Sequence, residues 1–207
     1  MMRKPREIVD GSTYHVSAKI NRGEFIFKDR ADLKILFFKL VKRTHGKYKF
    51  HVQGITVMDN HIHMTIKPSK GEKLGNIMNS ILSTFARRYN VIINSHGHVW
   101  YDRFKSKVIV TFTQYINTLR YICNNPLRAG MVNDPLSYKF CAVNALYTKE
   151  KSELVSIIQS IIDFKNKELL NIYDDYIKEF DVNKAIEKDI TIGFYPNNPG
   201  RPKKDKK

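Results

Sequence analysis

Two histidines stand one residue apart, His61 and His63, in the stretch MDNHIHM. Successive side chains of a strand point to opposite faces, so Ile62 and Met64 would turn toward the core and both histidines toward the open face. Neutral imidazole is a frequent metal ligand, and two imidazoles on one face of a rigid strand can share a cation. The pair therefore predicts half of a metal site, which still needs a third ligand. The alternative is two polar residues on an open strand face.

A second pair with the same spacing, His96 and His98, lies in the stretch NSHGHVW. A glycine separates these two histidines, and Asn94 and Ser95 precede them, which is a composition typical of turns. We therefore expect this pair to lie in a loop and to bind no metal.

The stretch FTQYINTLRYICNNPLRAG, residues 112–130, predicts an amphipathic helix that ends at Pro126. Tyr121 and Asn125 are four residues apart and share its polar face. If that face lies over the histidine-bearing strand, a phenol and an amide meet the two imidazoles. The alternative is that Tyr121 is a half-exposed packing residue.

Positioning these groups requires a sheet, and the sequence predicts one. Alternation and turn residues indicate strands, and periodic apolar residues indicate helices. The expected strands are residues 12–20, 48–58, 61–68 and 98–110, and the expected helices are residues 29–46, capped by Asp29, and 73–92. The turn-forming pair Asp59-Asn60 predicts a hairpin between the second and third strands. The second helix carries one apolar stripe, formed by Leu74, Ile77, Met78, Ile81, Leu82 and Phe85. This β-α-β-β-α-β order predicts an α+β protein with a ferredoxin-like antiparallel sheet and helices on one face. Two further helices are expected over 149–166 and 168–180.

The chain is strongly basic, with 36 Lys and Arg against 20 Asp and Glu in 207 residues, a formal net charge of +16. Such a balance predicts a nucleic-acid partner. No apolar run approaches the roughly 20 residues of a membrane span, and no amphipathic lipid-binding helix or signal peptide is recognisable, so no membrane partner is expected. Cys123 and Cys141 lack metal-ligand spacing, which favours a reducing, cytoplasmic location beside the nucleoid.

Basic side chains gather in and beside the motif region, and Trp100, Tyr101 and Phe104 alternate with some of them. Aromatic stacking on bases combined with phosphate contacts is typical of single-strand binding. The alternative for Trp100 is a place in the core. The predicted nucleic-acid-binding residues are Arg87, Arg88, Trp100, Arg103, Lys105, Lys107, Arg120, Arg128 and Arg201.

Arg201 belongs to the basic, Pro-rich stretch 197–207, which we expect to be disordered. The stretch Gly200-Arg201-Pro202 resembles the centre of AT-hook peptides, which bind the narrow minor groove of A·T-rich DNA. The alternative is a solvated tail that only adds positive charge.

Several of these motifs together resemble one family. The sequence resembles the single-tyrosine HUH transposases, closest to the REP-associated tyrosine transposases, in four parts that occur in the family's order. These parts are the strand 12–20, the pair His61 and His63, the stretch GHVWYDRFKS at 97–106 and the stretch LRYICNNPLRAGMV at 119–132. The resemblance covers roughly residues 8–140. It divides the chain into a transposase domain (1–140), a C-terminal helical extension (141–196) and the basic tail (197–207).

The resemblance implies that His61 and His63 bind a divalent metal, that Asn125 completes the metal site, and that Tyr121 attacks DNA. The implied product is a covalent 5′-phosphotyrosine, and the implied target is a single-stranded hairpin from a palindromic repeat. Mg²⁺ or Mn²⁺ suits a phosphate substrate and mixed nitrogen and oxygen ligands. The implied activity is a metal-dependent DNA strand transfer; both monomers and homodimers occur in such families, which leaves the oligomeric state open.

Two other functions remain open. A replication-initiator or relaxase-type nicking enzyme also joins an HUH pair to a tyrosine, but this chain shows no helicase motif. A catalytically silent nucleic-acid-binding protein on the same fold would retain the basic residues without the cutting reaction.

Overall fold

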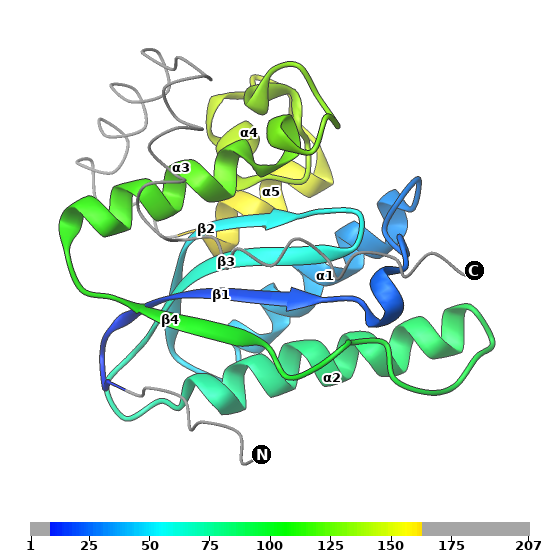
Figure 1. Ribbon diagram of the computed structural model, residues 1–207, viewed down its shortest axis with the longest axis horizontal. Coiled ribbons are helices and arrows are strands. Elements are labelled where there is room, and N and C mark those ends of the chain that lie inside the picture. Colours follow the sequence, from blue (N-terminus) through cyan, green and yellow to red (C-terminus); the bar gives the residue numbers. More distant parts are fainter. Residues whose placement is uncertain (1–8, 163–207) are drawn as a thin grey trace, which may run out of the picture. The chain divides into compact units, whose positions relative to one another are not determined.

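A computed structural model describes residues 9–162 of the chain. Its centre is a sheet in which every neighbouring pair of strands is antiparallel, in the order β2-β3-β1-β4 (Figure 1). The strands are β1 (Thr13–Lys19), β2 (Phe50–Val57), β3 (His61–Pro68) and β4 (Lys105–Ile109). The predicted ferredoxin-like, α+β fold is confirmed.

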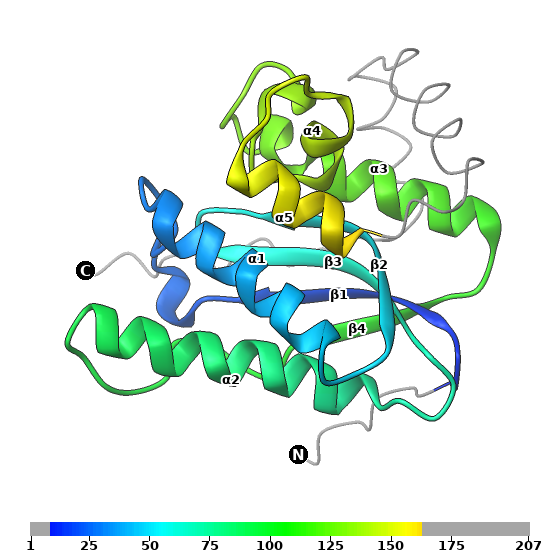
Figure 2. The ribbon, with the colours of Figure 1, turned by 180° about the vertical axis from the view of Figure 1, so that it is seen from behind.

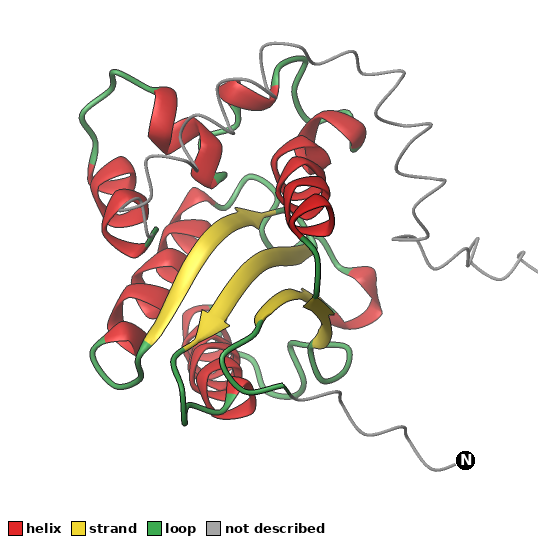
Figure 3. Ribbon diagram, turned by 90° about the vertical axis from the view of Figure 1, so that its left-hand side faces the viewer, coloured by secondary structure: helices red, strands yellow, loops and turns green. Residues whose placement is uncertain are grey.

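Helices cover both faces of this sheet unequally. Two long helices, α1 (Ala31–His45) and α2 (Leu74–Ile92), lie side by side on one face, while α3 (Phe112–Arg128) crosses the other face (Figures 2 and 3). The main hydrophobic core fills the space between the sheet and the first two helices. The histidine-bearing face of β3 is therefore the face that α3 covers.

The apolar periodicity of α2 correctly predicted its buried side. All the buried residues of this helix lie on the predicted stripe: Leu74, Ile77, Met78, Ile81, Leu82 and Phe85. The turn at Asp59 and Asn60 joins β2 to β3 in a hairpin, as predicted. Both features follow from local patterns, because side-chain periodicity and turn residues act within a few positions.

Three predicted boundaries are wrong. Asp29 does not cap α1, because its backbone adopts a positive φ of 54° and the cap position falls on Arg30. The predicted strand 98–110 is reduced to β4, since only Trp100 forms an isolated bridge before a loop. The third helix continues past Pro126 to Arg128.

The C-terminal part of the described chain packs on the same unit. Three short helices that the sequence did not predict connect the larger elements. They are η1 (Asn21–Gly23), η2 (Pro135–Ser137) and α4 (Ala142–Tyr147). The helix α5 (Glu153–Ile161) lies within the predicted range 149–166 and packs against α1. The predicted helix 168–180 and the basic tail with Arg201 lie outside the described residues. Across residues 9–162, no helix is both long enough and apolar enough to span a membrane.

Candidate active site

Strand β3 places His61 and His63 on the face that α3 covers. The Nδ1 atom of His61 lies 2.7 Å from the side-chain oxygen of Asn60 in the hairpin turn. The centroids of the two imidazole rings are 4.9 Å apart, with the rings nearly perpendicular. The turn therefore fixes the orientation of the first imidazole, and the strand brings the second beside it.

A third imidazole, that of His15 on β1, joins this pair. β1 and β3 are neighbours, with Ser17 opposite His63, so His15 projects from the same face two residues further along. Its Nε2 atom lies 3.1 Å from Nδ1 of His63, and the two rings are stacked with centroids 5.2 Å apart. Sequence reasoning missed this residue, although the alternation of the first strand contains the signal once the strand pairing is known.

Helix α3 brings Tyr121 to the imidazoles and carries Asn125 one turn further along. The hydroxyl oxygen of Tyr121 lies 3.5 Å from Nε2 of His63, and the two rings meet edge to face with centroids 5.1 Å apart. The side chain of Asn125 is buried, and its Nδ2 atom has no hydrogen-bond partner among the described residues. The structure thus brings Tyr121 beside the two histidines, whereas Asn125 lies buried one helical turn further along α3.

Burial makes the imidazoles neutral. The predicted open face is closed by α3, so His63 is only 7% exposed. Burial, reinforced by the neighbouring His15, lowers the pKa of His63 well below its usual value. Burial likewise lowers the pKa of His61 to about 4, with Lys19 adding to the effect and Asp59 opposing it. Burial and the nearby Lys107 lower the pKa of His15 to about 4.

The hydrogen bonds of His61 and His63 suit metal binding. The side-chain oxygen of Asn60 can only accept a hydrogen bond, so Nδ1 of His61 carries the hydrogen and Nε2 of that ring keeps a lone pair. If His15 accepts from Nδ1 of His63, Nε2 of His63 is also a lone-pair donor, and it faces Tyr121. Residues 9–162 contain no group of three or more His, Cys, Asp or Glu side chains arranged for a metal. A third protein ligand would therefore have to be of another kind, such as the amide of Asn125.

Some of the predicted DNA-binding residues surround this site. Arg128 lies over the ring of Tyr121, with its guanidinium carbon 5.5 Å from the ring centroid. Arg120 precedes the tyrosine on α3, and Lys105 and Lys107 are exposed on β4, next to the strand of His15. The tyrosine therefore lies in positively charged surroundings.

The other predicted residues lie elsewhere. Arg87 and Arg88 are exposed on α2, across the sheet from α3, and Arg103 is exposed in the loop before β4. Trp100 packs against Phe37 and Phe85, and its indole N–H donates to the carbonyl of Leu82 at 2.9 Å. Its ring thus packs partly against the core, which is the alternative given for it, and a role in base stacking stays a prediction.

The remaining aromatic and histidine predictions concern the loop before β4. Tyr101, which is 70% exposed, is the aromatic side chain that this loop presents to solvent. His96 and His98 are both exposed in a loop, as predicted.

Comparisons with known proteins identify the family of this chain and structures with a similar fold. A family model described as "Transposase IS200 like" matches residues 8–125. A solved REP-associated tyrosine transposase bound to a REP hairpin superimposes with a TM-score of 0.60 at 18% identity, covering 80% of this chain and 96% of that one. A candidate transposase from Deinococcus radiodurans R1 superimposes with a TM-score of 0.42 at 14% identity, covering 59% and 97%. No curated protein sequence matches.

Proposed function

Because the chain belongs to the IS200-like transposase family, we propose that it cleaves and rejoins single-stranded DNA through a covalent 5′-phosphotyrosine on Tyr121. The observation that carries this proposal is the convergence of two elements. The phenol oxygen of Tyr121 on α3 lies 3.5 Å from Nε2 of His63 on β3. We propose that both residues act within one chain.

The proposed reaction is a phosphoryl transfer. The Tyr121 oxygen attacks a backbone phosphorus, a phosphorus–oxygen bond to the tyrosine forms, and the bond to the 3′ oxygen of the upstream nucleotide breaks. The phenol proton leaves the tyrosine, and the released 3′ oxygen takes up a proton. Because the phosphotyrosine is itself a phosphodiester, a 3′-hydroxyl can reverse the attack and rejoin strands without ATP.

The residues present suit a bound Mg²⁺ or Mn²⁺. We propose that Nε2 of His61, Nε2 of His63 and the carboxamide of Asn125 would hold the ion. When bound, it would offset negative charge on the non-bridging phosphate oxygens and favour the phenolate. The buried, neutral imidazoles support this assignment.

The substrate we propose is a DNA hairpin with a single-stranded flank. Support comes from the positive charge around the tyrosine and from the similar solved transposase, which is bound to a REP hairpin. The basic residues Arg120, Arg128, Lys105 and Lys107 would contact the backbone on either side of the attacked phosphate.

Oligonucleotides labelled at one end test the proposal. With Mn²⁺, a 3′-labelled hairpin carrying a single-stranded flank should yield a band shifted by the mass of the protein on a denaturing gel. The same oligonucleotide labelled at the 5′ end should yield only a shorter free strand. A shifted band with the 5′-labelled oligonucleotide and a short free strand with the 3′-labelled one would mean a 3′-phosphotyrosine. That result would contradict the proposed polarity.

The same gel separates the rival functions. Binding without any covalent band would mean a catalytically silent binding protein. A covalent band with nicked duplex but none with hairpins would favour a replication-initiator or relaxase-type enzyme.

A further inference from the structure

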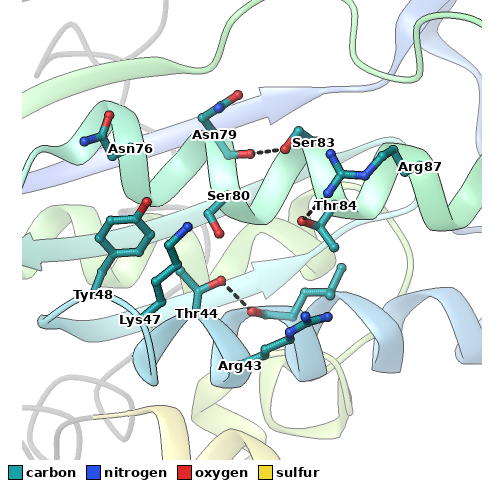
Figure 4. Close-up of a pocket in the computed structure, with 11 residues that line it drawn as sticks. Arg43, Thr44, Lys47, Tyr48, Asn76, Asn79, Ser80, Ser83, Thr84 and Arg87 are labelled. Carbon is teal, nitrogen blue, oxygen red and sulfur yellow. Dashed lines mark hydrogen bonds between the residues drawn. The ribbon is translucent and has the colours of Figure 1, made fainter.

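A polar groove lies between α1 and α2, across the sheet from Tyr121 (Figure 4). It has a volume of about 380 Å³. Figure 4 shows Arg43 of α1 with Lys47 and Tyr48 from the turn after it on one side, and Ser83, Thr84 and Arg87 of α2 on the other. The helix pair separates this groove from α3, so its ligand would be a different segment from the strand at the tyrosine.

The charge of the groove has one sign. Arg43, Lys47 and Arg87 line it, and none of its lining residues is acidic. The structure gives none of these three cations a salt bridge within residues 9–162, whereas the neighbouring Lys39 is paired with Glu153 at 2.7 Å. Three cations without carboxylate partners, held along one groove, create a positive potential that an anion would relieve.

The neutral lining residues point to the kind of anion. Asn76, Asn79, Ser80, Ser83 and Thr84 offer amide and hydroxyl donors beside the three cations. Arg, Lys, Ser, Thr and Asn side chains are those that contact phosphate oxygens in protein–DNA interfaces. A metal ion would need carboxylates, which the groove lacks, and base recognition would need stacking surfaces, of which Tyr48 alone is available.

The spacing of the cations favours a polymer over a single phosphate. Arg43 lies on the last turn of α1 and Lys47 in the turn that follows it, so both cations lie on the α1 side of the groove. Arg87 stands across the groove on α2 and is held by a hydrogen bond to Thr84 Oγ1 at 3.2 Å. A row of charges on two sides of a groove matches a backbone that carries a phosphate at every nucleotide.

We propose that the groove between α1 and α2 binds the sugar-phosphate backbone of a second, duplex DNA segment while single-stranded DNA occupies the tyrosine site. The contact is independent of sequence, because it reads phosphates and not base edges. It would hold the protein on duplex flanking the hairpin. The proposal goes beyond strand cleavage and does not depend on it.

The test is duplex binding by the double variant Arg43→Gln/Lys47→Gln. A matched control, Lys28→Gln/Lys42→Gln, removes the same charge from exposed positions that do not line the groove. With a blunt duplex of mixed sequence at about 0.15 M salt, the groove variant should bind roughly five- to tenfold more weakly, and its salt slope should fall by about two. The control should change affinity less than twofold.

Covalent adduct formation on a short single strand should be unaffected in both variants. Equal weakening by both pairs would show general charge attraction and would overturn the proposal, as would unchanged duplex binding by the groove variant. Two further probes cover other anions. If the groove variant loses binding of inorganic phosphate or of polyglutamate but keeps duplex binding, the groove is a small-anion or acidic-protein site and the duplex proposal is wrong.

Discussion

The hydroxyl of Thr56 on β2 donates to the main-chain carbonyl of Ile122 on α3 at 2.9 Å. In a regular helix this carbonyl would accept from the N–H of residue 126, but that residue is Pro126, which has none. A side chain from the sheet thus replaces the missing helical bond. It does so one residue from Tyr121, and it explains why the helix continues to Arg128 although a proline stands in its last turn.

We expect Thr56→Val to lower the free energy of unfolding by about 1–3 kcal/mol, because it leaves the buried carbonyl of Ile122 without a donor. It should also reduce the rate of adduct formation, since the bond helps to hold α3 over β3. Denaturant unfolding and single-turnover cleavage measure the two effects. Thr56→Ser keeps the hydroxyl and is the control; if it behaves as the valine variant does, the methyl packing is responsible and not the hydrogen bond.

The sequence placed several candidate residues correctly in the fold, while their roles stay predictions. The helical period put Tyr121 on the face of α3 that meets His63, and strand alternation put His61 and His63 on one face of β3. What the sequence could not provide was the covering of the sheet face by α3 and the neighbour relation of β1 and β3. Both depend on long-range pairing, which local patterns do not encode. The position of His15 beside His63 was missed for the same reason.

The errors in the elements have the same origin. Asp29 has a good capping side chain, but a positive φ at this position moved the start of the helix. Trp100 lies in the predicted strand 98–110, yet it forms only an isolated bridge, and its ring packs against Phe85. Tertiary contacts override local preference at both positions.

Replacing the proposed nucleophile separates chemistry from binding. We expect Tyr121→Phe to abolish the covalent adduct, because only the attacking oxygen is removed, while affinity for single-stranded DNA changes less than about twofold because the ring beneath Arg128 remains. Denaturing gels and fluorescence anisotropy measure the two effects. Tyr101→Phe is the control, as Tyr101 is exposed outside the site. An adduct that persists in Tyr121→Phe would assign the attack to another tyrosine, with Tyr115 and Tyr101 the next candidates.

The two histidine pairs should behave differently. His61→Ala or His63→Ala should remove metal-dependent adduct formation, whereas His96→Ala in the exposed loop should retain it. EDTA should abolish the reaction of the native protein, and added Mn²⁺ should restore it. Mn²⁺ titration calorimetry provides a readout that does not depend on activity. Equal loss in the loop variant would mean that the wrong pair was assigned to the metal.

His15 should act through His63. Partners of a metal-bound imidazole typically change metal affinity about 10–100-fold when removed, so His15→Leu should weaken Mn²⁺ binding by that order. His15→Gln should recover most of the affinity, because its carboxamide oxygen can still accept from Nδ1 of His63. A leucine variant with native Mn²⁺ affinity would show that the 3.1 Å contact only packs the two rings.

Acid should destabilise the metal-free protein through the buried imidazoles. Burial lowers the pKa of His15 from 6.5 to about 4, so between these values the unfolded chain binds more protons than the folded chain. Stability therefore rises with pH in this window. Above pH 6.5 His15 is neutral in both states and the free energy of unfolding keeps its full value. As the pH falls toward 4, the unfolded chain takes up a proton on His15 that the folded protein does not, and the free energy of unfolding decreases. At about 1.4 kcal/mol for each pH unit, the upper limit for this one residue is about 3 kcal/mol. Urea unfolding of the native protein should show the loss.

The variant His15→Gln isolates this effect from the carboxylates, which also titrate near the lower end of the window. Its side chain does not ionise, so its unfolding free energy should fall less steeply than that of the native protein between pH 6.5 and 4. The difference between the two curves should widen through the window and stay constant above it. Parallel curves across the whole range would mean that His15 takes up its proton in the folded protein as readily as in the unfolded chain, and that burial under α3 does not hold the imidazole cluster neutral.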